Sequence, residues 1–143
     1  QFDVGARYHN YAADLTRTFL VGKPTPKQRR IYDIVMEAQE KAFQKIRDGV
    51  KAKQVDAVAR NVIKKHGFGE NFVHGLGHGV GLAVHEPPTL NESSKDILKA
   101  GNVVTDEPGI YVVGYGGVRI EDTVLVKKDG AERLTKASYE LVV

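Results

Sequence analysis

The first part of the chain alternates between apolar and polar positions in the way that β-strands do. Residues 2–8 and 11–21 are rich in β-branched and aromatic side chains, and the polar pair His9 and Asn10 lies between them. Two such segments around a short polar pair predict a β-hairpin with a tight turn. We therefore expect the chain to begin with two paired strands.

The pattern then changes to the spacing of amphipathic helices. Thr25, Pro26 and Gln28 form a helix start, because they supply a threonine N-cap, a proline at the first helical position and a glutamine at the capping-box position. Gly49 ends this helix, and Gly67 ends a second one. The apolar positions at helical spacing are Ile31, Ile34, Val35, Ala38, Ala42 and Ile46 in the first helix, and Val55, Val58, Ala59, Val62 and Ile63 in the second, at about residues 53–66.

The rest of the chain predicts mostly strands. We expect a short helical turn at Ser93 to Lys99 and a tight turn at residues 127–130. Strands are expected at about residues 102–105, 109–113, 117–127 and 139–143. A hairpin, two helices and then strands predict an α+β fold rather than alternating β and α units.

The composition is that of an ordinary globular domain. The chain has 143 residues, of which 41% are hydrophobic and 27% charged, and this length suits one domain. The formal net charge is +3, but the basic residues are interspersed and form no stripe with aromatic side chains, which argues against nucleic-acid binding. Cysteine is absent and no long apolar run or signal peptide is visible, so we expect no disulfides, no membrane contact and a cytoplasmic location.

Three of the five histidines lie in the stretch HGLGHGVGLAVHEPP, residues 74–88, where four glycines separate them. On their own these histidines are compatible with metal ligation, acid–base chemistry or a polar loop. The other two, His9 and His66, fall in an expected turn and at an expected helix end, where a structural role suffices. A functional site therefore requires further groups elsewhere in the chain.

Four carboxylates could supply those groups. Asp3 and Asp14 are eleven positions apart on the expected hairpin, where paired strands can place them on one face. Glu107 and Glu121 are fourteen apart around the glycine-rich VVGYGG, residues 112–117, which predicts a second hairpin. Four carboxylates and one histidine would suit two divalent cations such as Mn²⁺, Co²⁺ or Fe²⁺ better than a closed zinc site. Solvated carboxylates without a metal stay the alternative at this point.

The segment DVGARYHNYAADLTRTF, residues 3–19, resembles the signature of the Xaa-Pro peptidase family. This family comprises metal-dependent prolidases and proline aminopeptidases, relatives of methionine aminopeptidase with the pita-bread fold. The histidine-rich stretch, TDEPGIY (105–111) and GGVRIEDTVLV (116–126) resemble the other family motifs in the same order. The resemblance covers nearly the whole chain, and GLGHGVGL and VHE are most similar to the bacterial Xaa-Pro dipeptidase branch.

This resemblance implies the C-terminal part of a pita-bread fold, an α+β architecture in which helices flank a curved antiparallel sheet. Residues 1–143 would be the C-terminal portion of the catalytic metallopeptidase domain, without the upstream half of that domain or an N-terminal domain. The chain begins with Gln1, already inside a strand pattern, which fits this expectation. We expect the isolated chain to be inactive or weakly active, and the full-length protein to be a homodimer.

The resemblance also implies two divalent metal ions, Mn²⁺ or Co²⁺, and their ligands. Asp3 would hold one metal, while His78 and Glu107 would hold the other. Asp14 and Glu121 would bridge both. All five positions carry the residue type of the family.

Further roles follow from the same motifs. Glu107 would also move a proton from the attacking water to the leaving proline nitrogen, and His85 would hydrogen-bond the substrate and stabilise the tetrahedral intermediate. His74 would contact the proline or carboxylate side of the substrate. Arg119 would lie near the metals as a substrate-carboxylate or supporting group, with Tyr111 as a weaker supporting candidate.

Two positions depart from the family pattern. Asp106 stands where relatives usually have an apolar residue, and Ala83 stands where they often have an acidic one. Strand alternation should point Asp106 away from the metals, where it must meet a cation or solvent. Glycines around His78 are expected to let the backbone pass close to the metals and the substrate. These four glycines are Gly75, Gly77, Gly79 and Gly81.

The implied activity is metal-dependent hydrolysis of the bond before proline in Xaa-Pro dipeptides, which are small peptides with proline at the second position. The alternative within the family is an Xaa-Pro aminopeptidase that releases the first residue of longer peptides. A different class of function, a binding module that keeps the fold without catalysis, is disfavoured because all five ligand positions are intact.

Overall fold

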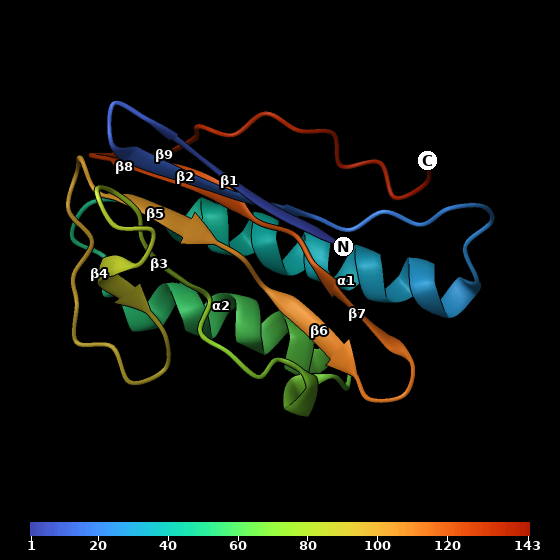
Figure 1. Ribbon diagram of the computed structural model, residues 1–143. Helices are drawn as coiled ribbons and strands as arrows, with labels where there is room; N and C mark the ends of the chain where they lie inside the picture. The colour runs from blue at the N-terminus through green and yellow to red at the C-terminus, as the bar shows by residue number, and fades with distance from the viewer.

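The computed structural model describes residues 1–143, in which two α-helices lie along one side of a set of antiparallel strands (Figure 1). The helices are α1 (Pro26–Lys45) and α2 (Ala52–Lys65), followed by the short 3-10 helix η1 (Gly69–Asn71). The strands are β1 (Phe2–Tyr8), β2 (Tyr11–Arg17), β3 (Gly77–Gly79), β4 (Glu86–Leu90), β5 (Val103–Asp106), β6 (Gly109–Val112), β7 (Gly116–Arg119), β8 (Asp122–Lys127) and β9 (Gly130–Arg133).

The predicted N-terminal hairpin is confirmed. Strands β1 and β2 pair up to Tyr8 and Tyr11, and His9 and Asn10 form the turn with φ angles of 47° and 69°. A two-residue turn with both φ angles positive matches the right-handed twist of the strands that it joins. The second strand ends at Arg17 rather than at residue 21, because the chain leaves the hairpin there.

Both predicted helices are confirmed, although α1 ends at Lys45 and not at the expected Gly49, whereas both ends of α2 lie within one residue of expectation. Thr25 caps α1 as the sequence predicts, because its Oγ1 accepts a hydrogen bond from the Gln28 amide and the Gln28 side chain accepts one from the Thr25 amide. After α1 the chain turns at Gly49, whose φ of 77° favours glycine. The apolar faces of both helices turn towards the strands.

The strands form three small sheets. Strands β4, β3, β5, β8 and β9 follow one another in a five-stranded antiparallel sheet, while β1 pairs with β2 and β6 pairs with β7. An antiparallel bridge between Thr16 and Glu121 joins the β1–β2 hairpin to the segment between β7 and β8. This bridge brings the beginning of the chain alongside residues more than a hundred positions away.

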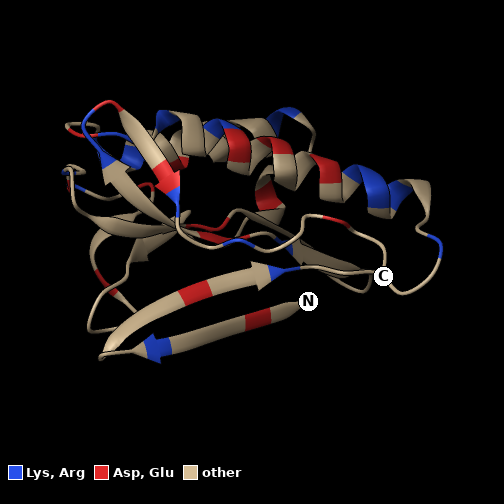
Figure 2. Ribbon diagram, turned by 90° about the horizontal axis from the view of Figure 1, so that it is seen from above, with Lys and Arg blue, Asp and Glu red and all other residues tan.

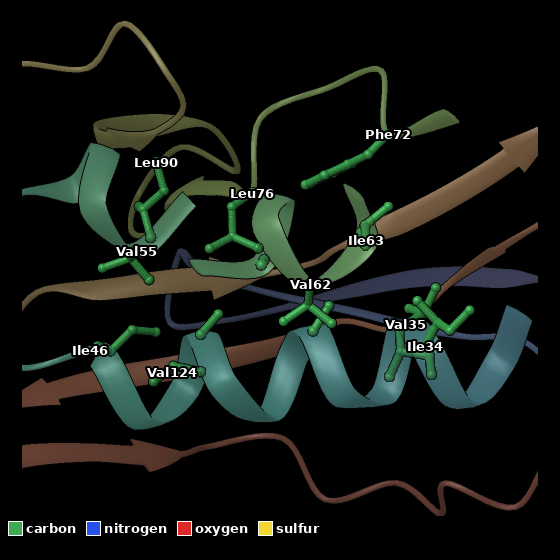
Figure 3. Packing of buried hydrophobic residues seen from close by; sticks show 14 of the residues in the cluster. Ile34, Val35, Ile46, Val55, Val62, Ile63, Phe72, Leu76, Leu90 and Val124 are labelled. Atoms are coloured by element: carbon green, nitrogen blue, oxygen red, sulfur yellow. The ribbon is translucent and has the colours of Figure 1, made fainter. Parts of the chain in front are cut away.

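The hydrophobic core lies between the helices and the five-stranded sheet. Figure 3 shows Val35 of α1, Val55 and Ile63 of α2, and Leu76 and Leu90 among the buried side chains of this core. Burying one such side chain contributes about 1.5–3 kcal/mol. The core therefore fixes α2 and the segment around Leu76, which carries the histidine-rich stretch. Neither helix is both long and apolar enough to cross a membrane.

Three expectations are wrong in detail. Ser93 to Lys99 form no helical turn, because the Asn91 side chain accepts a hydrogen bond from the Ser93 amide and Ile97 forms a bridge with Lys51. The strand expected at 117–127 is two strands, since β7 pairs with β6 whereas β8 pairs with β5 and β9. The strand expected at 139–143 is reduced to a bridge between Leu20 and Val142. Strands β3, β4 and β9 were not expected.

Candidate metal centre

The β1–β2 hairpin places two carboxylates on one of its faces. Asp3 is opposite Thr16, and Gly5 is opposite Asp14, so Asp3 and Asp14 are diagonal neighbours on the same side of the ribbon. Figure 2 shows this hairpin with one acidic residue in each strand. The side-by-side placement expected from the sequence is therefore observed.

His78 lies at the centre of β3, between β4 and β5. Its Nδ1 is 3.0 Å from the Gly79 carbonyl oxygen, which can only accept, so Nδ1 carries the proton in the neutral ring. Its Nε2 lies 3.3 Å from Glu107 Oε1 and 3.8 Å from Asp14 Oδ2. A metal-binding histidine has this arrangement, with one nitrogen on a backbone carbonyl and the other facing carboxylates.

Glu107 and Glu121 follow and precede strands of the five-stranded sheet. The Glu107 amide donates to the Leu76 carbonyl oxygen, and the Glu121 amide donates to the Thr16 carbonyl oxygen. Glu121 is buried, and its Oε2 accepts a hydrogen bond of 2.5 Å from the Thr16 hydroxyl. The β6–β7 hairpin between the two glutamates brings them to the same side of the sheet.

Four of the five expected ligands converge. One side-chain ligand atom from each of Asp14, His78 and Glu121 lies within 4.8 Å of the other two, and Glu107 joins them through His78. Asp3 lies further out, with a side chain that is 54% exposed and forms an ion pair with Arg119. Arg119 therefore pairs closely with Asp3 and more distantly with Glu107, whose Oε2 lies 3.9 Å from Arg119 Nε.

The cluster holds more negative charge than its surroundings neutralise. Burial, reinforced by the charge of Glu107, raises the pKa of Glu121 to about 8. Burial and the charge of Asp3 also raise the pKa of Asp14. Burial alone would lower the pKa of His78, but its contacts with Glu107, Gly79 and Asp14 outweigh that effect and raise it.

These residues fit divalent cations. Two carboxylates with raised pKa values and an imidazole nitrogen directed at them form a donor set that a positive ion would stabilise. Hard oxygen donors with one imidazole suit ions such as Mn²⁺, and no cysteine is present to favour a structural zinc site.

The glycines of this stretch are required by close packing. A Cβ atom on Gly77 would lie 2.2 Å from the Thr105 carbonyl oxygen, and one on Gly79 would lie 2.4 Å from the Pro87 carbonyl oxygen. Neither backbone neighbour can move without disturbing β4 or β5. The backbone at Gly77 and Gly79 therefore packs closely against the neighbouring strands β5 and β4. Close packing within the sheet thus explains these two glycines, in place of the expected approach to metals and substrate.

A polar pocket of about 390 Å³ opens beside the cluster, without any hydrophobic side chain in its lining. It contains the three histidines of the stretch and Arg119, together with Thr89 and Asn91, which the sequence had not singled out. The lining residues are His74, Gly75, Gly77, His78, His85, Thr89, Asn91, Glu107 and Arg119. A separate, partly apolar pocket of about 180 Å³ near Phe19 and Tyr115 holds none of the candidate residues.

His85 and His74 occupy different parts of this pocket. The His85 ring lies beside His78, with 4.1 Å between ring centroids, and His85 is exposed. His74 is held through both ring nitrogens, because Nδ1 lies 2.8 Å from the Gly75 carbonyl oxygen and Nε2 lies 2.8 Å from the Tyr111 hydroxyl. His85 is thus free to meet a ligand, whereas His74 is fixed in the wall.

A chain of hydrogen bonds through the Tyr111 hydroxyl connects Arg119 to His74. Arg119 Nη1 donates to the Tyr111 hydroxyl oxygen at 3.1 Å, since a guanidinium can only donate. The Tyr111 hydroxyl hydrogen is then directed to His74 Nε2, and His74 Nδ1–H is directed to Gly75. Arg119 also donates to the Thr16 hydroxyl oxygen and pairs with Asp3, so it joins the pocket wall to the acidic cluster.

Three threonines that were not among the predicted site residues donate hydrogen bonds to the cluster. The Thr16 hydroxyl donates to Glu121, and the Thr105 hydroxyl donates to Glu107 Oε1 at 2.9 Å. The Thr123 hydroxyl donates to the backbone carbonyl of Asp14 at 2.7 Å. The available signal was position, because in β-strands residues two apart share a face and each threonine is two positions from a candidate ligand.

Asp106 points away from the cluster, as strand alternation predicts. Its backbone carbonyl accepts a hydrogen bond from Gln39 of α1, on the helix side of the sheet. The side chain is 1% exposed, and neither carboxylate oxygen has a hydrogen-bond partner. Burial holds the pKa of Asp106 well above its usual value, although the charge of Arg133 opposes this. Both expected outcomes are therefore wrong, because the Asp106 carboxylate is neither exposed to solvent nor bonded to a cationic side chain.

Comparison with known proteins adds independent findings. The profile of metallopeptidase family M24 matches residues 1–128. An Xaa-Pro dipeptidase of Pyrococcus furiosus is 52% identical over 140 residues, which are 98% of this chain and 40% of that relative. The chain thus spans about 40% of the length of the curated relatives that it matches first.

Solved structures agree in fold. The Xaa-Pro dipeptidase from Bacillus anthracis superimposes with a TM-score of 0.96 at 46% identity, covering 99% of this chain and 40% of its own. The X-Pro aminopeptidase from Thermotoga maritima gives 0.95 at 44% identity, covering the same shares. Superpositions of this quality confirm the α+β architecture expected from the sequence.

Proposed function

The chain belongs to metallopeptidase family M24 and has the α+β pita-bread architecture of its structural neighbours, and from this membership we propose that the protein hydrolyses the peptide bond before proline in Xaa-Pro dipeptides. The observation that carries the proposal is the convergence of Asp14, His78 and Glu121, with Glu107 beside them, at the edge of a polar pocket. The names of the relatives, Xaa-Pro dipeptidases at about half identity, support the substrate class.

We propose Asp3, Asp14, His78, Glu107 and Glu121 as the residues that hold two divalent ions, Mn²⁺ or Co²⁺. Such ions would polarise the scissile carbonyl group and lower the pKa of a water molecule. The exposed position of Asp3 and its pairing with Arg119 mean that Asp3 must release this partner, or share it, to bind an ion.

Glu107 is the proposed proton carrier. Its Oε1 is anchored by the Thr105 hydroxyl, while Oε2 lies 3.9 Å from Arg119 Nε in the pocket wall. One oxygen held and one directed towards the pocket is an arrangement that can accept a proton from the attacking water and pass it to the leaving proline nitrogen.

The polar pocket supports a substrate that ends in a charged group. His85 is exposed beside His78 and is the proposed donor to the substrate and to the oxyanion of the tetrahedral intermediate. His74 and Arg119 form the wall that would meet the carboxylate of a dipeptide. Because no hydrophobic side chain lines this pocket, we assign it to the charged end of the dipeptide and not to the proline ring.

An Xaa-Pro aminopeptidase is the second candidate, because the Thermotoga maritima structure of that name superimposes equally well. The non-catalytic alternative is disfavoured by the intact ligand positions. Three further expectations from the sequence stay predictions. They are a homodimer for the full-length protein, a cytoplasmic location, and the assignment of residues 1–143 to the C-terminal portion of a larger catalytic domain.

The test uses the protein at its natural length after reconstitution with Mn²⁺. We expect hydrolysis of Ala-Pro, little hydrolysis of Ala-Ala, and slower release of alanine from Ala-Pro-Gly-Gly. Glu107→Gln should lower kcat by about 10²–10⁴-fold, as the loss of a proton carrier does, while Glu140→Gln at an exposed position serves as the matched control. Faster cleavage of the tetrapeptide would favour the aminopeptidase, and cleavage of neither proline peptide would overturn the proposal.

A further inference from the structure

A buried ion pair lies on α2, outside the candidate metal centre. Arg60 Nε and Nη2 each donate to one carboxylate oxygen of Asp56, both at 2.9 Å. The Asp56 side chain is fully buried, and that of Arg60 is 17% exposed. Ion pairs between residues four apart are common on exposed helix faces, where water satisfies their other hydrogen-bonding groups. This pair is almost removed from water, so those groups must bond to other parts of the protein.

The remaining hydrogen bonds of this pair go to the segment that carries His74. Arg60 Nη1 donates to the Phe72 carbonyl oxygen at 3.0 Å, and Arg60 Nη2 donates to the His74 carbonyl oxygen at 2.8 Å. Asp56 Oδ1 accepts from the Leu76 amide at 3.0 Å. The pair thus fixes the backbone on both sides of His74.

The same guanidinium also supports the His74 ring. It lies over the Phe72 ring at 4.3 Å from the centroid, and the Phe72 ring meets the His74 ring edge-on, with 5.1 Å between centroids. Phe72 is 3% exposed, so its position is determined by packing. His74 is therefore held at its backbone, by ring contact with Phe72 and, through Tyr111, at its Nε2.

Helix stability alone is a poor explanation for this arrangement. Exposed pairs at this spacing contribute about 0.2–0.5 kcal/mol, and the desolvation of a buried pair often cancels its attraction. The geometry is specific in another way, since the planar guanidinium reaches a carboxylate and two carbonyl oxygens at once. Lysine, a point charge on a flexible stem, cannot reproduce that fork.

We propose that Asp56 and Arg60 are positioning residues for substrate binding, which set the place of His74 in the pocket wall. This inference rests on the proposed function, in which His74 meets the carboxylate side of the substrate. Neither residue lines the polar pocket, so both act through the segment from Phe72 to Leu76.

The test is a double-mutant cycle in the protein at its natural length, with Arg60→Lys and His74→Ala alone and together. Arg60→Lys keeps a charge beside Asp56 but loses the two carbonyl bonds, so it should raise KM for Ala-Pro by about tenfold or more, with a smaller change in kcat. In the His74→Ala background Arg60→Lys should have no further effect on KM. The control is Arg30→Lys, at an exposed position of α1.

A second readout does not depend on activity. The imidazole resonances of His74 in the metal-free protein, assigned by their loss in His74→Ala, should shift in Arg60→Lys and in Asp56→Asn but not in Arg30→Lys. Unchanged resonances, or an Arg60→Lys effect on KM that is equally large without His74, would overturn the inference. A wild-type protein that cleaves no Xaa-Pro peptide would instead overturn the proposed function.

Discussion

The Thr16 hydroxyl donates to Glu121 Oε2 across 2.5 Å, and both side chains are buried. The two residues also form the backbone bridge that joins the N-terminal hairpin to the segment after β7. The bond therefore orients a candidate metal ligand and joins two distant parts of the chain at the same point. The Thr105 hydroxyl in β5 likewise donates to Glu107 Oε1 and orients that side chain.

Replacing Thr16 by valine should weaken metal binding while leaving the fold intact. Valine keeps the shape and strand preference of threonine but removes the hydroxyl that orients Glu121. Loss of such an outer partner typically costs about 10–100-fold in metal affinity. Mn²⁺ titration calorimetry measures this, with Thr18→Val as control because the Thr18 hydroxyl bonds only backbone atoms of Arg119. Equal Mn²⁺ affinity in wild type and Thr16→Val would show that Glu121 needs no such orientation.

His78 and His85 should separate metal binding from turnover. His78→Ala removes the nitrogen that faces Asp14 and Glu107, so the protein should lose bound metal and activity together. His85→Ala should keep its metal and lose kcat by about 10²-fold or more, because His85 is proposed to act on the oxyanion. Metal analysis and Ala-Pro kinetics on the same samples distinguish them. A metal-free His85→Ala variant would contradict the division of roles.

Asp106 and Asp122 face each other across β5 and β8 but differ in their partners. Asp122 accepts four side-chain hydrogen bonds, whereas the Asp106 carboxylate accepts none. Asp106→Val should raise the free energy of unfolding by about 1–3 kcal/mol, since an unsatisfied buried group disappears. Asp122→Asn should lower it by about 3–5 kcal/mol, because buried Arg17 loses its counter-charge. Urea denaturation measures both, and destabilisation by Asp106→Val would reveal a role that its contacts do not show.

Tyr139 should make the fold sensitive to alkaline pH. Burial, together with the bond that its hydroxyl donates to Asp122, raises the pKa of Tyr139 to about 12 from an ordinary 10.0. A raised folded-state pKa gives a stabilisation that is complete below pH 10 and is lost as the pH rises through 12. Tyr139→Phe should therefore lose less stability than wild type between these values, as measured by urea denaturation. Tyr8→Phe, at an exposed tyrosine, should follow the wild-type curve.

Local signals in the sequence predicted the hairpin and the helices well. The turn at His9 and Asn10 and the capping box at Thr25 are short-range features that need no information about distant partners. The metal ligands could not be predicted from local signals in this way. The spacing of the carboxylates was equally compatible with solvated side chains that bind no metal. The order of the family motifs, and not any periodicity, supported choosing His78 among three histidines.

The remaining features depend on long-range pairing. Strand β3 has the sequence GHG, which has no strand preference of its own, and it forms because β4 and β5 lie on both sides. The break between β7 and β8 likewise arises where the chain changes its pairing partner. The hydrogen bonds from the Asp56–Arg60 pair to the segment around His74 join a helix to a loop. Neither helical spacing nor a sequence motif predicts contacts of this kind.

The most direct test of the metal centre is the number of Mn²⁺ ions bound per chain after reconstitution and dialysis, measured by elemental analysis on the protein at its natural length. We predict two ions in wild type and a loss of bound metal in Asp14→Asn, whose carboxylate lies within 4.8 Å of a ligand atom of His78 and of Glu121. The exposed Asp129→Asn should retain both ions. No bound metal in wild type, or an unchanged number in Asp14→Asn, would contradict the account.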